Sequence, residues 1–187
     1  MRHMDSHRHF LLGPAAVLVS ALVVAGCHQP AHPDEKTAVT NSLGSNNLNS
    51  ISVSQDRDKG VMTLTGNVGS DDQKNHAESL AKQAAPDYTI ADEIGVRPEG
   101  DSNAGAVASN LDSAIEDNFK ASIKAHNNLD DQSIHVTAKN GTLVLKGSVK
   151  TLKQKKEAES LAKHVPNVQQ VVNELEVKPT KHSTSNS

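Results

Sequence analysis

The chain has 187 residues, a formal net charge of −3 and a mean hydropathy of −0.51. One cysteine excludes an intramolecular disulfide framework. Two phenylalanines, one tyrosine and no tryptophan leave no stacking platform for single-stranded nucleic acid, and the charge is not basic enough for a nucleic-acid protein.

The N-terminal segment has the order of a secretion signal. Arg2 and Arg8 precede an uncharged, apolar run over 10–26. The run ends in Val-Ala-Gly-Cys, which resembles the lipobox of bacterial lipoproteins and implies lipid attachment (palmitate among the acyl chains) at Cys27. We therefore expect a signal peptide over 1–26. The alternatives are a plain signal peptide and an uncleaved anchor with an incidental cysteine.

The position after the cysteine bears on location. His28 stands where some lipoproteins carry the aspartate that retains them in the inner membrane. By this resemblance the protein is expected to be lipid-anchored in the outer membrane, facing the periplasm. Residues 27–33 are polar and are expected to form a loose tether, and attached acyl chains would hold it stably.

An internal repeat organises the rest of the chain. At an offset of 81, residues 60–98 match 141–179 with 15 identities in 39 positions, including the hexapeptide AESLAK at 77–82 and 158–163. We expect a first unit over 34–98, a linker over 99–108 whose end can join the next helix, a second unit over 109–179 and a disordered tail over 180–187. Units this small are expected to be marginal alone and to gain from packing on each other.

The elements of the first unit follow a helix-strand-strand-helix-strand order. A weak helix is expected at 35–43, a turn at 56–60 and a third strand at 88–96. Asp71 and Asp72 are expected to begin the second helix, where carboxylates suit the helix dipole.

The second unit repeats this order more clearly. Apolar residues at helical spacing predict a helix over 109–126, and alternation predicts strands at 133–138 and 142–149 joined by a Lys-Asn-Gly turn. A second helix over 151–164 stops at Pro166, and a third strand covers 169–177. Its core face stays open between two registers, Val171 with Leu175 or Val172 with Val177. Gly66 and Gly147 mark places where a strand bends or another backbone approaches.

These motifs resemble the BON domain family. The G-x-x-x-L-x-G strand occurs at 60–66 and 141–147, the A-E-x-L-A helix follows in both units, and V-x-N-E-L closes the second. The resemblance implies an α+β fold of two tandem modules, each a small three-stranded mixed sheet packed by two helices. The chain as a whole resembles dual-domain outer-membrane lipoproteins and osmotically induced periplasmic relatives. This resemblance implies that the protein binds phospholipid and supports envelope integrity, without catalysis.

The same resemblance places the lipid contact on the first helix of the second unit. The candidates there are Phe119, Lys120, Ile123 and Lys124, expected to contact anionic lipid. Phe119 and Ile123 also share a helical stripe with Leu111 and Ile115, so a role in the core is the alternative.

A second basic candidate follows the last hairpin of the chain. It consists of Lys150, Lys153, Lys155 and Lys156. Near an anionic surface each lysine contributes about 1 kcal/mol. The alternative is an ordinary exposed helix face balanced by Glu157 and Glu159.

Other chemistry finds little support in the sequence. The histidines show no metal-ligand spacing such as H-E-x-x-H, no serine lies in G-x-S-x-G, and no cysteine is left for catalysis. We therefore expect no enzyme activity, no metal, no cofactor and no nucleic-acid partner. The leading hypothesis is a membrane-associated binding module. The alternatives are a stress or chaperone-like protein that binds exposed peptide, and an adaptor docked on another envelope protein; the oligomeric state stays open.

Overall fold

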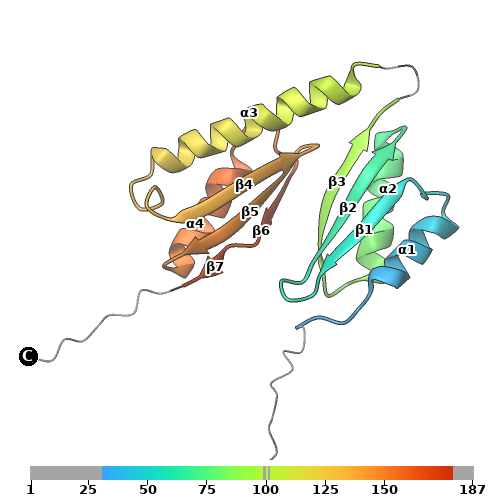
Figure 1. The fold of residues 1–187 in the computed structure, drawn as a ribbon, viewed down its shortest axis with the longest axis horizontal. Helices are drawn as coiled ribbons and strands as arrows, with labels where there is room; N and C mark the ends of the chain where they lie inside the picture. The colour runs from blue at the N-terminus through green and yellow to red at the C-terminus, as the bar shows by residue number, and fades with distance from the viewer. Residues whose placement is uncertain (1–30, 99, 101, 179–187) are drawn as a thin grey trace, which may run out of the picture.

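The computed structural model describes residues 31–98, 100 and 102–178 (Figure 1). The expected signal peptide, Cys27 and the tail over 180–187 lie outside these residues. Among the helices in the described ranges, none combines the length and the apolar composition needed to cross a bilayer.

The first unit contains two helices on one face of a mixed sheet (Figure 1). Its elements are α1 (Lys36–Ser45), β1 (Ile51–Asp56), β2 (Val61–Val68), α2 (Asp71–Ala84) and β3 (Thr89–Val96). Strand β2 lies in the middle, antiparallel to β1 and parallel to β3. The predicted order of elements is confirmed.

The second unit repeats this arrangement. Its elements are α3 (Ala104–Lys124), β4 (Ser133–Lys139), β5 (Thr142–Val149), α4 (Leu152–Lys163), β6 (Gln170–Asn173) and β7 (Glu176–Val177). Strand β5 is antiparallel to β4 and parallel to β6 and β7. The protein is therefore α+β with two small mixed sheets, as expected.

The expected third strand of the second unit is interrupted between β6 and β7. At the interruption the amide of Leu175 donates to the side chain of Asn173 at 3.2 Å. Asp92 makes the equivalent bond to Ile94 at 3.0 Å in the first unit, where the strand stays continuous. The structure decides the register: Val171, Leu175 and Val177 face the unit's own core, and Val172 faces the first unit.

Each unit has its own aliphatic core. Met62, Leu64 and Ile94 are fully buried in the first, and Leu143, Leu145 and Phe119 in the second. Phe119 is the largest of the fully buried side chains among the described residues and is 1% exposed. The structure therefore places the Phe119 side chain in the core, which was the alternative to lipid contact.

Helix α3 begins five residues before the expected 109. Residues 104–108, assigned to the linker from their small and polar composition, form its first turns. Alanine favours the helix, and a tertiary contact supports it: a Cβ at Gly105 would lie 2.9 Å from the Arg97 guanidinium, which follows β3. The helix therefore reaches from the second unit to the first (Figure 1).

The end of the expected tether is attached to the first unit. The amide of His32 donates to the Arg57 carbonyl at 3.1 Å, and the Arg57 side chain donates back to the His32 carbonyl at 3.0 Å. The Tyr88 hydroxyl donates to the carbonyl of Pro33. The expectation of a loose segment over 27–33 is therefore wrong for its last residues, because main-chain groups there pair with the hairpin of β1 and β2.

Candidate functional sites

A small pocket lies between α3 and β4 and gathers all four residues predicted for lipid contact. Phe119, Lys120, Ile123 and Lys124 line this cavity of about 170 Å³ together with Asp130, Gln132, Ile134 and Val136. Its walls are apolar and its rim carries two lysines. We call it the α3–β4 pocket. The helical spacing of 119, 120, 123 and 124 places them on adjacent turns, which explains why they meet.

The two rim lysines differ in their partners. Lys120 donates to Glu116 at 3.0 Å, whereas the described residues provide no ion pair or hydrogen bond for the exposed ammonium of Lys124. Glu116 also accepts the Ala138 amide at 3.0 Å, so it fastens α3 to β4. That amide, and then Lys120, hold the pKa of the Glu116 carboxyl below its ordinary value. Among the described residues, Lys124 is therefore the unpaired cation of this lining, which also holds the exposed Asp130.

The second basic candidate separates into different environments. Lys150 pairs with Asp131, and Lys155 is half-buried toward the first unit, whereas Lys153 and Lys156 are exposed. Leu152, on the same first turns of α4, is 60% exposed. The structure does not gather the four lysines into one patch.

The two units meet at a junction that joins equivalent surfaces. Val61, Ala91, Val144 and Val172 form a separate buried cluster there. Ala91 and Val172 are equivalent at the repeat offset of 81. Sequence reasoning anticipated packing between the units but assigned none of these residues to it, because their apolar character is shared with every strand.

One half of the junction is closed by polar side chains of the second unit that bind the edge of β3. The Gln170 carboxamide donates to the Ile90 carbonyl and accepts the Asp92 amide, both at 2.8 Å. The Thr142 hydroxyl donates to the Asp92 carbonyl. Asn140 donates to the Glu93 carbonyl at 2.8 Å. Main-chain groups that an edge strand would expose are thus paired within the chain.

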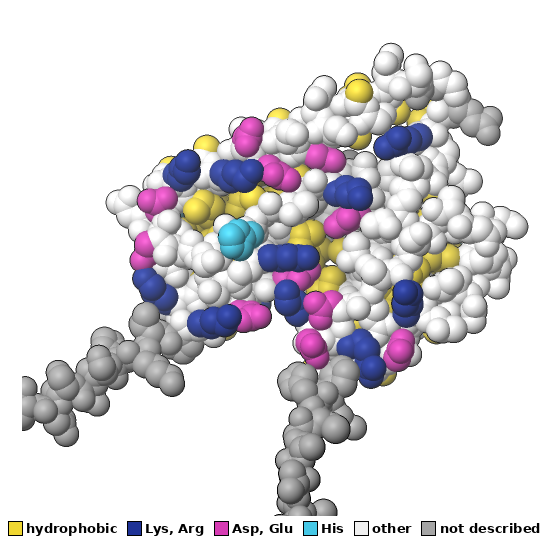
Figure 2. All heavy atoms as spheres, in the orientation of Figure 1, with side chains coloured by type: hydrophobic (Ala, Val, Ile, Leu, Met, Phe, Trp, Pro, Cys, Tyr) yellow, Lys and Arg dark blue, Asp and Glu magenta, His cyan; other side chains and the backbone are white. Residues whose placement is uncertain are grey.

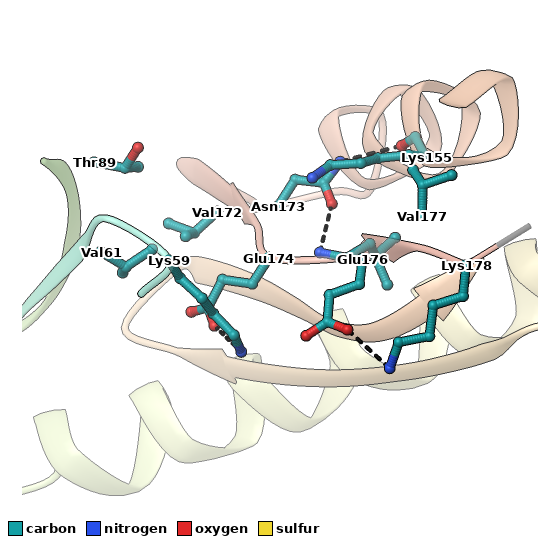
Figure 3. Close-up of a pocket in the computed structure, with 11 residues that line it drawn as sticks. Lys59, Val61, Thr89, Lys155, Val172, Asn173, Glu174, Glu176, Val177 and Lys178 are labelled. Atoms are coloured by element: carbon teal, nitrogen blue, oxygen red, sulfur yellow. Dashed lines mark hydrogen bonds and ion pairs between the residues drawn. The ribbon is translucent and has the colours of Figure 1, made fainter. Parts of the chain in front are cut away.

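The other half of the junction is open. A hollow of about 550 Å³ is lined there by Lys59, Val61 and Thr89 of the first unit and by Lys155 and the β6–β7 segment (172–178) of the second (Figure 3). We call it the junction hollow. Lys59 reaches across it to Glu174, at 3.0 Å, and this hydrogen bond raises the pKa of the lysine. In Figure 2 lysine and acidic side chains alternate over this face, with apolar atoms between them.

A buried carboxyl beside the closed half gives a pH-dependent prediction. Asp92 is 6% exposed, and burial raises the pKa of its carboxyl above the ordinary value. The repeat has Asn173 at the equivalent position, where the amide donates to the Lys155 carbonyl and to Glu159, each at 3.1 Å. Asp92→Asn is therefore expected to raise the melting temperature at pH 7.

The sign follows from the raised pKa. The folded state binds the proton more tightly than the unfolded state, so the charged carboxyl lowers stability as pH rises above its ordinary pKa near 3.8. The gain from Asp92→Asn should shrink as pH falls toward that value, in calorimetric scans from pH 7 to pH 4. An equal gain at both ends of the range contradicts the assignment.

No group of three or more histidine, cysteine or acidic side chains in the described ranges has the arrangement needed to hold a metal ion.

Comparison with known proteins bears on the repeat. The BON domain model matches residues 35–98 and 111–179, which are the two structural units. This chain belongs to the BON domain family. Osmotically-inducible protein Y of Escherichia coli is 30% identical over 132 residues, which are 71% of this chain and 65% of that protein. The chain thus spans a little less than two thirds of that relative's length.

Solved structures give weaker similarity. Two structures of CdsD, a structural protein of the type III secretion system of Chlamydia trachomatis, each align with a TM-score of 0.31 and 12% identity. They cover 78% and 80% of this chain and 98% and 94% of theirs. These values are too low to bear on what the two BON domains do.

Proposed function

We propose that this chain is a non-catalytic, lipid-anchored BON protein of the outer membrane, facing the periplasm, whose second domain binds anionic phospholipid and supports envelope integrity under osmotic stress. The observation that carries the proposal is the α3–β4 pocket, which combines apolar walls with the rim lysines Lys120 and Lys124. The lipobox and the relative named for osmotic induction support the location and the condition.

The position of the first domain fits an anchor at Cys27. Only four residues lie between Cys27 and His32, which is bonded to the first domain, so the two are five chain steps apart. An extended chain of that length reaches at most about 18 Å. A lipidated Cys27 would therefore hold the domains close to the bilayer, where weak contacts gain from high effective concentration.

The buried ring of Phe119 changes the expected mode of contact. A ring that is 1% exposed belongs to the floor of the pocket, so lipid would be met by the ammonium groups and by the partly buried Ile123. Binding of this kind depends on anionic headgroups and weakens with salt.

Flotation with vesicles tests the proposal on residues 28–187, which lack the acyl anchor and keep every described residue. Phosphatidylglycerol vesicles should recover the protein and phosphatidylcholine vesicles should not. Lys120→Glu with Lys124→Glu should weaken binding by tenfold or more, because two lysines near the surface contribute about 2 kcal/mol.

The matched control is Lys153→Glu with Lys156→Glu, which reverses the same number of exposed charges on α4 and should leave flotation nearly unchanged. A larger loss in this control moves the contact to α4. Equal background recovery with both vesicle types rejects lipid binding altogether.

A further inference from the structure

The outer edge of β6 borders the junction hollow. Strand β6 pairs with β5 alone, so it is an edge strand of its sheet. Glu174 donates its amide toward β5, to the Leu145 carbonyl at 2.9 Å. Because strand residues alternate in direction, the main-chain groups of Val171 and Asn173 point away from β5.

The repeat shows what such an edge binds. At the offset of 81, Val171 and Asn173 correspond to Ile90 and Asp92 of β3. In β3 these two residues hold the carboxamide of Gln170. The carbonyl and one N–H of this side-chain carboxamide bond to the same edge, as the N–H and C=O of a single residue in an added parallel strand would. The β3 edge therefore already binds a mimic of an added strand.

In the open half, the side chains equivalent to Gln170 and Thr142 cannot make the same bonds, because one is too short to reach the strand edge and the other has no hydrogen-bond donor. Thr89 stands where the other half has Gln170, and Val61 stands where it has Thr142. Among the described residues, no side chain of the first domain is bonded to the outer groups of Val171 and Asn173. The junction hollow is thus the position of the missing carboxamide, left open.

The charge of the hollow indicates a partner. Lys59 is paired with Glu174, and Lys178 is paired with Glu176 at 2.8 Å. The half-buried Lys155 lines the same space, and within the described ranges its ammonium has no ion pair. An acidic side chain entering the hollow would meet this lysine.

We propose that the junction hollow binds an extended peptide, which adds as a strand to the outer edge of β6 and places an acidic side chain at Lys155. Main-chain groups at strand spacing favour a peptide, since β-strand addition pairs successive amides and carbonyls. Each such hydrogen bond contributes about 0.5–1.5 kcal/mol. This is a binding activity separate from lipid contact at the α3–β4 pocket.

The test uses residues 28–187 and the peptide Thr-Val-Glu-Val-Thr-amide with fluorescein on its N-terminal amine, followed by fluorescence anisotropy. The wild-type chain should bind one peptide. Thr89→Gln installs the carboxamide that closes the other half, and should weaken binding by about tenfold or more without lowering the melting temperature. The same peptide with alternate N-methylated amides should bind as weakly, because it keeps the side chains and loses the donors.

Two further variants test whether the changes in peptide binding arise at the junction hollow itself. Lys155→Glu should weaken binding of this acidic peptide, and replacing the peptide glutamate with lysine should restore it. Gln170→Thr with Thr142→Val gives the closed half the side chains of the open half and should raise the stoichiometry from one peptide to two. Flotation of Thr89→Gln on phosphatidylglycerol vesicles should match the wild type.

The proposal is overturned if wild type does not bind the peptide, or if Thr89→Gln or N-methylation leaves binding unchanged. Loss of flotation in Thr89→Gln with unchanged peptide binding would instead make the hollow a lipid site. Failure of flotation in the wild type, with peptide binding intact, rejects the lipid function and leaves the peptide site standing.

Discussion

Truncating Phe119 to alanine is expected to destabilise the second BON domain by about 3–5 kcal/mol, as for other fully buried aromatic side chains. The ring is 1% exposed and packs with Ile115, Leu145 and Ala158 in a core that holds no other aromatic residue in the described chain. Small domains have a total stability of only about 5–15 kcal/mol. The variant should therefore unfold at much lower denaturant concentration.

Phe119→Leu is the control for this change, because it keeps most of the apolar volume. It should cost much less stability and leave phospholipid binding near the wild-type level, measured below the unfolding transition. If Phe119→Ala changes the free energy of unfolding by less than 1 kcal/mol, the ring is not a core residue. A loss of lipid binding in Phe119→Leu at full stability would return the ring to the contact surface.

The sequence predicted the elements of both domains well where pattern and turn chemistry agree. Leu143, Leu145 and Val149 lie on one face of the strand predicted at 142–149, and all three are in the core. The Asn140-Gly141 turn was predicted from residues that accept positive φ, and both have it, at 49° and 82°. Ser70 and Thr151 accept amides of the first turns of α2 and α4, as N-caps do.

The failures arose where distant contacts decide the local structure. The start of α3 has linker composition; the sequence allowed the end of the linker to join the helix, but its first residue depends on the packing of these turns against Arg97. Leu152 is an apolar residue in the helix predicted at 151–164, yet it is 60% exposed, because the repeat places it where α2 begins with Asp71. The break between β6 and β7 follows Asn173, and because Asp92 accepts the equivalent bond in the unbroken β3, neither periodicity nor this side-chain bond accounts for it.

The candidate sites were predictable in part. Helical spacing brought Phe119, Lys120, Ile123 and Lys124 to one pocket, but the apolar walls from β4 needed the fold. The junction hollow was not predicted at all. The repeat does contain a signal for it: Gln170 and Thr142 of the second unit are replaced by Thr89 and Val61 at the equivalent positions of the first. The structure was needed to show that these positions lie at the junction, where Gln170 and Thr142 bond to the edge of β3.

Replacing Gly147 with alanine is expected to destabilise the second BON domain by roughly 2–5 kcal/mol. Gly147 has φ of 109°, a conformation that L side chains rarely adopt, and a Cβ there would collide with the carbonyl oxygen of Ser133 on β4. Strain at such a backbone position costs about 1–3 kcal/mol, and forcing neighbouring atoms apart costs about as much again. The collision is with main chain, so no rotamer change relieves it.

Gly44→Ala provides the control, because Gly44 lies inside α1 and its Cβ would come no closer than 3.4 Å to Asn49. It should leave stability unchanged or raise it by about 0.5–1 kcal/mol. Gly66, equivalent to Gly147, has φ of 132° and would meet the Ser50 carbonyl, so Gly66→Ala should destabilise the first domain similarly. Chemical denaturation of the three variants checks this, and a Gly147→Ala change within 0.5 kcal/mol of wild type contradicts the backbone described.

Because Gln170 and Thr142 bind β3, we expect either strand variant to lower a single shared transition. Two separated transitions would mean that the junction does not couple the domains.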